Sequence, residues 1–358
     1  MKLIFYIFFL LSFSLFSQKD SVLFEKEVKL NSYLKTLRSS ENNTEKLKNN
    51  KIFKSYLEEI LQLDGVFDYP FSKLKTLGTI KSDDNLLRFF NWNIEMDDHS
   101  QKYFCYILRK DKRKKKIFLS ELVDNSLMLP SRPDGVLDSK NWYGALYYKI
   151  IPITKGNRTM YTLLGMDANN SMSNIKVIDV LYFTGNSPRL GSSVFKTNDG
   201  TKKRIFFEYS KKAYMSLKYE KEYKRIIYDH LSPETPSMTG FYSYYVPDFS
   251  YDAFIYYKNK WVLQEAVVGV NKKGGEKLKV FVQNKKTGEL ETREIDNKWI
   301  DPSDKKAANG GNVHVARTPD MDTEKNDKFK LNFNFLKRKG GWRNRRTPES
   351  YSNYPYKK

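Results

Sequence analysis

One histidine in the chain stands close to several carboxylates and could therefore support general acid–base chemistry. Asp229 and His230 are adjacent, and Asp248 and Asp252 follow at expected strand ends. Histidine titrates near neutral pH, and a carboxylate can orient it as a general base, so this group predicts a hydrolase. A structural alternative stays open, in which Asp229 and His230 satisfy backbone groups where a strand stops.

The densest charge in the sequence is a basic run that could bind an acidic polymer. It comprises Arg109, Lys110, Lys112, Arg113, Lys114, Lys115 and Lys116. Because the run lies between two expected strands, we predict a hairpin tip that projects into solvent. The structural alternative is a solvated loop without a partner, and the functional one is contact with an anionic envelope polymer or another envelope protein. Nucleic acid is disfavoured, because we expect export and find no nucleic-acid-binding motif.

The sequence carries no recognisable metal or cofactor motif. His99, His230 and His314 form no zinc-binding pattern, and no glycine loop for phosphate or dinucleotide binding occurs. The stretch 167–171 supplies oxygen side chains at alternate positions, as half of a calcium loop does. The glycine and glutamate that complete such a loop are missing. We therefore predict a plain turn there, no metal and no cofactor.

We expect β-strands to position these residues. The clearest signal is the stretch 203–230, where β-branched and aromatic residues alternate in three short runs that we interpret as an antiparallel meander. Further strands are expected at 86–92, 102–108, 116–122, 143–152, 159–165, 175–183, 194–196, 241–245, 253–257 and 261–266. Many strands with turns between them predict a mainly β fold of antiparallel sheets, sandwich-like or, as the alternative, a small propeller.

The two ends of the chain differ from this β region. Residues 21–63 carry apolar residues at helical spacing in two runs, with Asn43 or Thr44 as the cap of the second. The expected order is a signal peptide at 1–17, a helical segment at 18–65, an antiparallel β domain at 66–300 with a last hairpin near 280–293, and a disordered basic tail at 301–358.

The composition fits an exported, basic protein with a substantial core. Of 358 residues, 40% are hydrophobic and 15% aromatic, and the formal net charge is +21. Such charge attracts acidic polymers and anionic surfaces. The single cysteine, Cys105, excludes an intramolecular disulfide, and its apolar neighbours predict that it is buried. The N-terminal run predicts a periplasmic or cell-surface location, and no later segment has the length and apolarity of a membrane-spanning helix.

Five stretches carry a resemblance to a known group. They are NWYGALYYKIIP, YTLLGMDANN, KVIDVLYF, RIFFEYSKKAYMSLKYEKEYKRIIYDHLSP and PDFSYDAF with the following NKWV. They resemble a group of exported proteins of Bacteroidetes-type bacteria without an assigned activity. The resemblance implies a signal peptide and a shared β domain over residues 20–268, and no catalytic residues. The sequence as a whole favours a non-enzymatic envelope protein that binds an acidic or glycan partner, with a hydrolase near His230 as the alternative.

Overall fold

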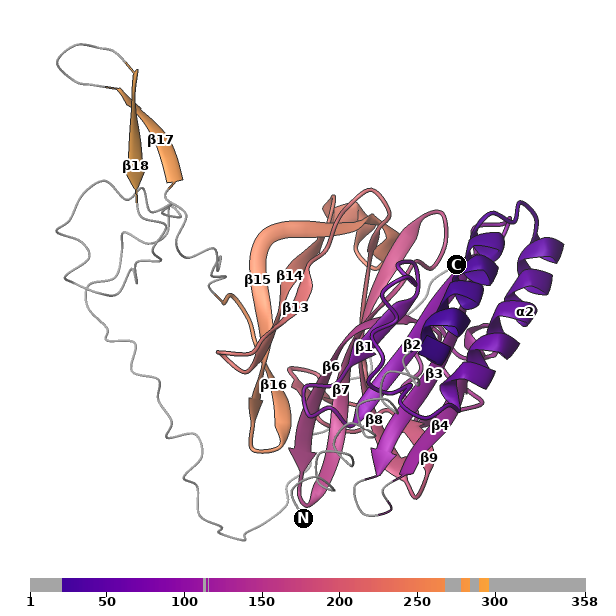
Figure 1. The fold of residues 1–358 in the computed structure, drawn as a ribbon. Helices are drawn as coiled ribbons and strands as arrows, with labels where there is room; N and C mark the ends of the chain where they lie inside the picture. Colours follow the sequence, from indigo (N-terminus) through magenta and orange to yellow (C-terminus); the bar gives the residue numbers. More distant parts are fainter. Residues whose placement is uncertain (1–20, 112–113, 115, 268–277, 284–289, 296–358) are drawn as a thin grey trace, which may run out of the picture. The chain divides into compact units, whose positions relative to one another are not determined.

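The computed structural model describes residues 21–111, 114, 116–267, 278–283 and 290–295. The chain divides into two units, Met1–Asn271 and Lys272–Lys358. In the first unit, two helices and three sheets lie in successive layers (Figure 1). The described part of the second unit is the hairpin of β17 (Leu278–Gln283) and β18 (Leu290–Ile295), which confirms the hairpin expected there. The predicted signal peptide and basic tail lie outside the described residues.

Two helices form the first layer, as predicted. One covers residues 21–38 and the other is α2 (Asn43–Leu61). The N-cap of α2 is Asn42, one residue before the expected position, and its side chain accepts a hydrogen bond from the Glu45 backbone N–H. The apolar faces of both helices are buried against the first sheet, with Leu34 and Phe53 among the residues in that core.

The first sheet has the order β1 (Gly78–Lys81), β2 (Leu87–Glu95), β3 (Gln101–Asp111) and β4 (Lys116–Val123). All its pairs are antiparallel. Successive side chains of a strand point to opposite faces. Phe90 and Trp92 accordingly join the core beneath the helices, whereas Phe89 and Cys105 join the core shared with the second sheet. Cys105 is buried, as expected.

The second sheet is covered on both faces. Its order is β5 (Leu137–Asp138), β9 (Ser187–Leu190), β8 (Ser173–Thr184), β7 (Arg158–Asp167) and β6 (Leu146–Lys155), and β12 (Ile205–Ser210) pairs with the first half of β8. On adjacent positions of β7, Leu163 faces the first sheet and Leu164 faces the third. Val177 and Ile178 repeat this division on β8. The second sheet, which is the middle layer of the three sheets, therefore contributes side chains to two hydrophobic cores.

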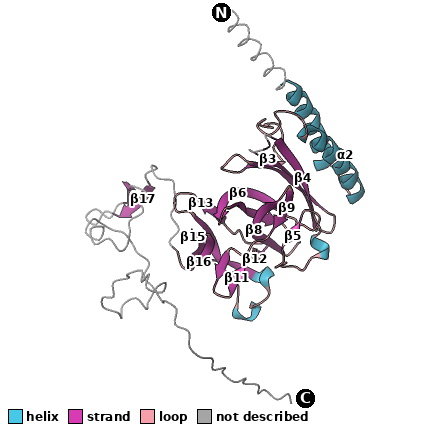
Figure 2. Cartoon of the chain, turned by 90° about the horizontal axis from the view of Figure 1, so that it is seen from below, coloured by secondary structure: helices cyan, strands magenta, loops and turns pink. Residues whose placement is uncertain are grey.

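The third sheet has the order β11 (Gly200–Lys202), β10 (Phe195–Thr197), β16 (Lys260–Gln264), β15 (Tyr245–Tyr257), β14 (Arg225–Pro233) and β13 (Leu217–Glu220). The β10–β16 pair is parallel and the others are antiparallel. Figure 2 shows the same succession of layers from a second direction, from α2 through β3 and β4 to β15 and β16. The prediction of antiparallel sheets in a mainly β fold is confirmed, and the sheets pack face to face in a stack.

Two local predictions were wrong. The stretch 203–230 is not one meander, because β12 pairs with β8 of the second sheet, whereas only β13 and β14 form a hairpin. The stretch 241–245 is not a strand but contains a single 3-10 turn, η3 (Tyr242–Tyr244), after Gly240 at φ +91°. Two further 3-10 turns are η1 (Ser126–Met128) and η2 (Pro236–Met238). Among the described helices none combines the length and the apolar character needed to cross a membrane.

Candidate functional site

His230 lies in an irregular part of the β14–β15 ladder. Asp229 is opposite Tyr251 and Leu231 is opposite Pro247, so residues 248–250 of β15 bulge out opposite His230 alone. Phe249 at the centre of this bulge has φ +69° and is 97% exposed. A bulge re-aims side chains that a regular strand would send to fixed faces. This one brings two carboxylates to the same histidine.

The two ring nitrogens of His230 face different aspartates. Nδ1 is 2.7 Å from Asp252 Oδ2, and Nε2 is 3.9 Å from Asp248 Oδ2. Asp252 is only 5% exposed, and its other oxygen accepts a hydrogen bond from the Ala266 backbone N–H at 3.0 Å. The hydrogen bond with Asp252 raises the pKa of His230; burial opposes the rise, while the charges of Asp252, Asp248 and Glu265 reinforce it. The arrangement favours the imidazolium form.

A nucleophile is not aligned with this histidine. Ser232 donates its hydroxyl hydrogen to Asp248 Oδ2 at 2.7 Å, not to the ring. Burial would raise the pKa of Asp248, but hydrogen bonds from Ser250 and Ser232 lower it overall. Asp229 is turned to another partner, since its carboxylate accepts from the Ser216 backbone N–H at 2.7 Å. The structure thus gathers three of the four predicted residues, His230, Asp248 and Asp252, and leaves Asp229 out.

The basic run occupies the β3–β4 hairpin, where the sequence placed it. Its first two residues are engaged at the base of the hairpin. Arg109 donates to Asn186 Oδ1 at 2.8 Å and lies 4.4 Å from the centre of the Phe183 ring. Lys110 pairs with Asp68 at 3.0 Å. These two side chains hold the hairpin against neighbouring elements on opposite faces, so they are not free for a partner.

The rest of the basic run differs from its base. The side chains of Lys114 and Lys116 are exposed, and neither has a carboxylate partner among the residues that the structure describes. The Lys114 ammonium lies 5.5 Å from the centre of the Phe118 ring, and its backbone N–H donates to Asp111 at 3.1 Å. Lys112, Arg113 and Lys115 lie outside the described residues.

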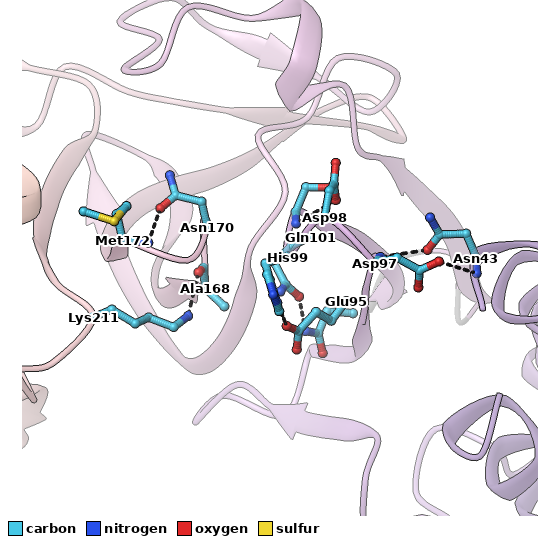
Figure 3. A network of polar contacts seen from close by, with 12 residues as sticks. Asn43, Glu95, Asp97, Asp98, His99, Gln101, Ala168, Asn170, Met172 and Lys211 are labelled. Atoms are coloured by element: carbon cyan, nitrogen blue, oxygen red, sulfur yellow. Dashed lines mark hydrogen bonds and ion pairs between the residues drawn. The ribbon is translucent and has the colours of Figure 1, made fainter. Parts of the chain in front are cut away.

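The second described histidine and the calcium-like stretch belong to ordinary turns. His99 lies on the β2–β3 turn, exposed, with Nδ1 2.9 Å from Glu95 Oε1 (Figure 3). In the stretch 167–171, Asn170 Oδ1 accepts from the Met172 backbone N–H at 2.8 Å (Figure 3). Asp167 is buried and accepts hydrogen bonds from the hydroxyls of two tyrosines. These oxygens are used inside the fold, and the stretch forms the connection between β7 and β8.

Sequence patterns did not reveal a cavity between β12 and the third sheet. Its lining is drawn from distant stretches, with Arg132, Arg204, Tyr228 and Glu265 among the residues. No local sequence pattern distinguishes any of these residues from its neighbours in the chain. They meet because β12 joins the second sheet while the strands that follow it form the third. The cavity could have been found only by predicting that β12 pairs with β8. The sequence pattern favoured a meander instead.

Comparison of the chain with protein-family models, with curated proteins and with solved structures finds no significant match. The resemblance to exported proteins of Bacteroidetes-type bacteria therefore stays a prediction from the sequence. A functional proposal has to rest on the geometry of the described residues.

Proposed function

We propose that the protein is a non-enzymatic component of the cell envelope that binds an anionic envelope polymer through the β3–β4 hairpin. The observation that carries this proposal is that some cations of the basic run have partners within the fold and others do not. Arg109 and Lys110 fix the base of the hairpin, while Lys114 and Lys116 are presented to solvent without carboxylates beside them among the described residues. Export is part of the proposal and rests on the N-terminal apolar run, which lies outside the described residues.

A fixed hairpin with free lysines suits an extended acidic partner. Exposed ammonium groups attract a row of phosphates or carboxylates over about a Debye length, roughly 8 Å at physiological salt. The hairpin base need not reorganise on binding, because its cations already have partners. Ordering costs on association are correspondingly small.

Salt dependence and charge removal test this proposal. The probe is heparin as a model acidic glycan, with vesicles carrying lipopolysaccharide as the second probe. Each exposed lysine near an anionic surface contributes about 1 kcal/mol. The double variant Lys114→Gln with Lys116→Gln is therefore expected to bind roughly thirty-fold more weakly at low salt. Binding of the wild type is expected to weaken steadily as salt rises.

The matched control removes the same charge elsewhere. Lys48 and Lys51 are exposed on α2, and their double glutamine variant has the same net charge as the hairpin variant. It is expected to bind like the wild type. Equal losses in both variants would mean that total charge, not the hairpin, attracts the polymer. Binding that ignores both salt and the hairpin lysines would remove the proposal.

A hydrolase is the second candidate, and the observation that favours it is the 2.7 Å contact of His230 with the buried Asp252. Against it, Nε2 faces Asp248 and the Ser232 hydroxyl is given to Asp248. A general base needs its free nitrogen directed at the proton it removes. If a broad panel of ester, peptide and glycoside substrates is turned over, and His230→Gln and Asp252→Asn abolish that turnover, the hydrolase replaces the first proposal.

A further inference from the structure

A ligand-sized cavity lies where β12 of the second sheet meets the third sheet. Its volume is about 620 Å³, the largest of the four cavities described for the first unit, whose others measure about 320, 390 and 280 Å³. Small-molecule sites usually have volumes between roughly 300 and 1,000 Å³. The hairpin of the proposed function and the His230 pair do not contribute to its lining.

One wall of the cavity includes a row of aromatic rings. Phe207 of β12 lies 4.4 Å from Tyr228 of β14, measured between ring centres, and Tyr228 lies 5.8 Å from Phe254 of β15 in a stacked arrangement. All three residues line the cavity. An aromatic face carries partial negative charge, so it attracts polarised C–H groups that pack flat upon it. Tyr228 and Phe254 are only 6% and 1% exposed, so the half-buried Phe207 is the member of this row with surface for the apolar face of a ligand.

Two polar groups at the cavity have unused hydrogen-bonding capacity, and of their unpaired atoms only Arg204 Nη2 is fully buried. Tyr228 is 6% exposed, and its hydroxyl has no hydrogen-bond partner among the described residues. Arg204 is 4% exposed; its Nε donates to Asp179 and its Nη1 to the Pro133 carbonyl, whereas its Nη2 has no partner in the described part of the chain. Buried polar groups are normally paired, so each exception calls for a reason. Arg204 Nη2 is such an exception, whereas the Tyr228 hydroxyl is not fully buried and is accessible to a hydroxyl-bearing ligand.

The charges around the cavity balance one another. Lys202 pairs with Asp199 at 3.3 Å, and Glu265 accepts a hydrogen bond from Asn198 at 2.9 Å. The charge of Arg204 is compensated by Asp179, 2.7 Å away and 1% exposed in its side chain. A site for a strongly charged ligand would carry an excess of the opposite sign. Mixed donors and acceptors suit hydroxyl groups instead, because each hydroxyl both donates and accepts.

We propose that this cavity binds a short neutral saccharide. The apolar face of a sugar ring packs on the aromatic wall, and its hydroxyls reach Tyr228, Glu265 and the other polar groups at the rim. This inference is independent of the acidic partner at the hairpin. It gives the protein a second site of a different chemical class.

The test measures binding of defined neutral trisaccharides of glucose, mannose, galactose and N-acetylglucosamine by titration calorimetry and by saturation-transfer NMR. We expect saturable binding of at least one of them. Tyr228→Phe removes one hydroxyl and should weaken binding about five- to tenfold. Glu265→Gln replaces a charged acceptor and should weaken it about tenfold. Tyr257→Phe is the matched control, since Tyr257 is 46% exposed and does not line the cavity.

The variants should remain folded, because the Tyr228 hydroxyl has no protein partner to lose among the described residues and Glu265 is exposed. Thermal unfolding of each variant checks this. The inference is overturned if no trisaccharide of the panel binds. It is also overturned if Tyr228→Phe and Glu265→Gln bind as the wild type does, or if the same cavity variants weaken binding of an acidic sugar while the neutral panel stays inert.

Discussion

The two outer interfaces of the first unit treat buried polar groups differently. Between the helices and the first sheet, which we call the helix layer, several such groups are paired within the fold, although the Nε of the buried Arg88 has no partner among the described residues. Glu27 is fully buried and accepts from the Tyr69 hydroxyl at 2.7 Å, and Asn50 accepts from the Trp92 indole at 2.8 Å. Between the second and third sheets, Tyr228 lines the cavity and its hydroxyl, which is not fully buried, has no hydrogen-bond partner among the described residues.

This difference suggests separate roles for the two interfaces: the helix layer stabilises the fold, and the interface between the second and third sheets has room for a ligand. A matched polar pair contributes modest net stability but is costly to break, because the remaining partner is left without a hydrogen bond. An unmatched group costs free energy in the empty protein and regains it when something binds. Substitutions in the helix layer should therefore change the free energy of unfolding, and those at the cavity wall should change binding.

The largest expected effect is in the helix layer. Phe53 is fully buried and its ring lies edge-on to Trp92 with centres 5.2 Å apart. Phe53→Ala should lower the free energy of unfolding by about 3–5 kcal/mol, because it leaves a cavity as well as losing apolar contact. Urea denaturation measures the change. Affinity for a saccharide should not alter while the variant remains folded.

The neighbouring Ile52 is 44% exposed and provides the control. Ile52→Ala should change stability by no more than about 0.5 kcal/mol. If both variants lose the same stability, or if Phe53→Ala weakens saccharide binding as strongly as Tyr228→Phe does, the separation of the two faces does not hold.

The next effect concerns the ion pair behind the cavity. Arg204→Leu leaves Asp179 buried without its partner and should cost about 3 kcal/mol of unfolding free energy. Burial raises the pKa of Asp179, although Arg204 opposes that rise. The double variant with Asp179→Leu removes both charges and should recover much of the loss. A double variant as unstable as the sum of the two single ones would show that the pair acts through packing alone.

The sequence predicted those elements whose signal is local. The helical spacing of Leu34, Phe53 and Leu57 predicted both helices, and these residues are buried in the helix layer. Phe89 and Phe90 are adjacent yet belong to different cores, which is the two-sided burial expected of a central strand. The alternation of hydrophobic residues thus placed most strands within a few residues of their actual bounds.

The sequence could not specify long-range pairing. In β12, Phe206 packs toward the first sheet and Ile205 toward the third, so the strand needs a place in the middle layer. The free edge of β8 at residues 173–178 provides it, and nothing in the local pattern indicates that edge. The candidate site followed the same rule. His230 and Asp252 lie on the adjacent strands β14 and β15 and were predicted, whereas the cavity depends on the unpredicted β8–β12 pair.

A matched pair of tyrosines sharpens the comparison at smaller magnitude. Tyr106 is 1% exposed and donates to Glu58 of α2 at 2.9 Å, whereas the hydroxyl of Tyr228 has no described partner. Tyr106→Phe should cost about 1 kcal/mol of unfolding free energy, since a hydrogen bond to a carboxylate is lost. Tyr228→Phe should leave stability nearly unchanged. Chemical denaturation of both variants in one buffer decides, and a larger loss for Tyr228→Phe would contradict the contrast.

The smallest expected effect is the pH dependence contributed by His230, a polar contact of the third sheet that solvent reaches. Its side chain is 43% exposed, so screening limits the pair with Asp252 to less than about 1 kcal/mol. The hydrogen bond to Asp252 raises the pKa of His230 above its ordinary 6.5. A raised pKa in the folded state means that folding favours the protonated ring. The stabilisation is therefore complete below about pH 6.5 and is lost as pH rises through the folded pKa.

The measurement is the difference in unfolding free energy between the wild type and His230→Gln from pH 6 to pH 9. We expect a positive difference at pH 6 that declines toward pH 9. In an Asp252→Asn background the same substitution should show a much flatter profile, because the carboxylate that favours the imidazolium is gone. A difference that grows with pH would mean that the neutral ring is the stabilised form. His230 would then be available as a base. This result would favour the hydrolase, although the contacts of Nε2 and of Ser232 with Asp248 argue against it.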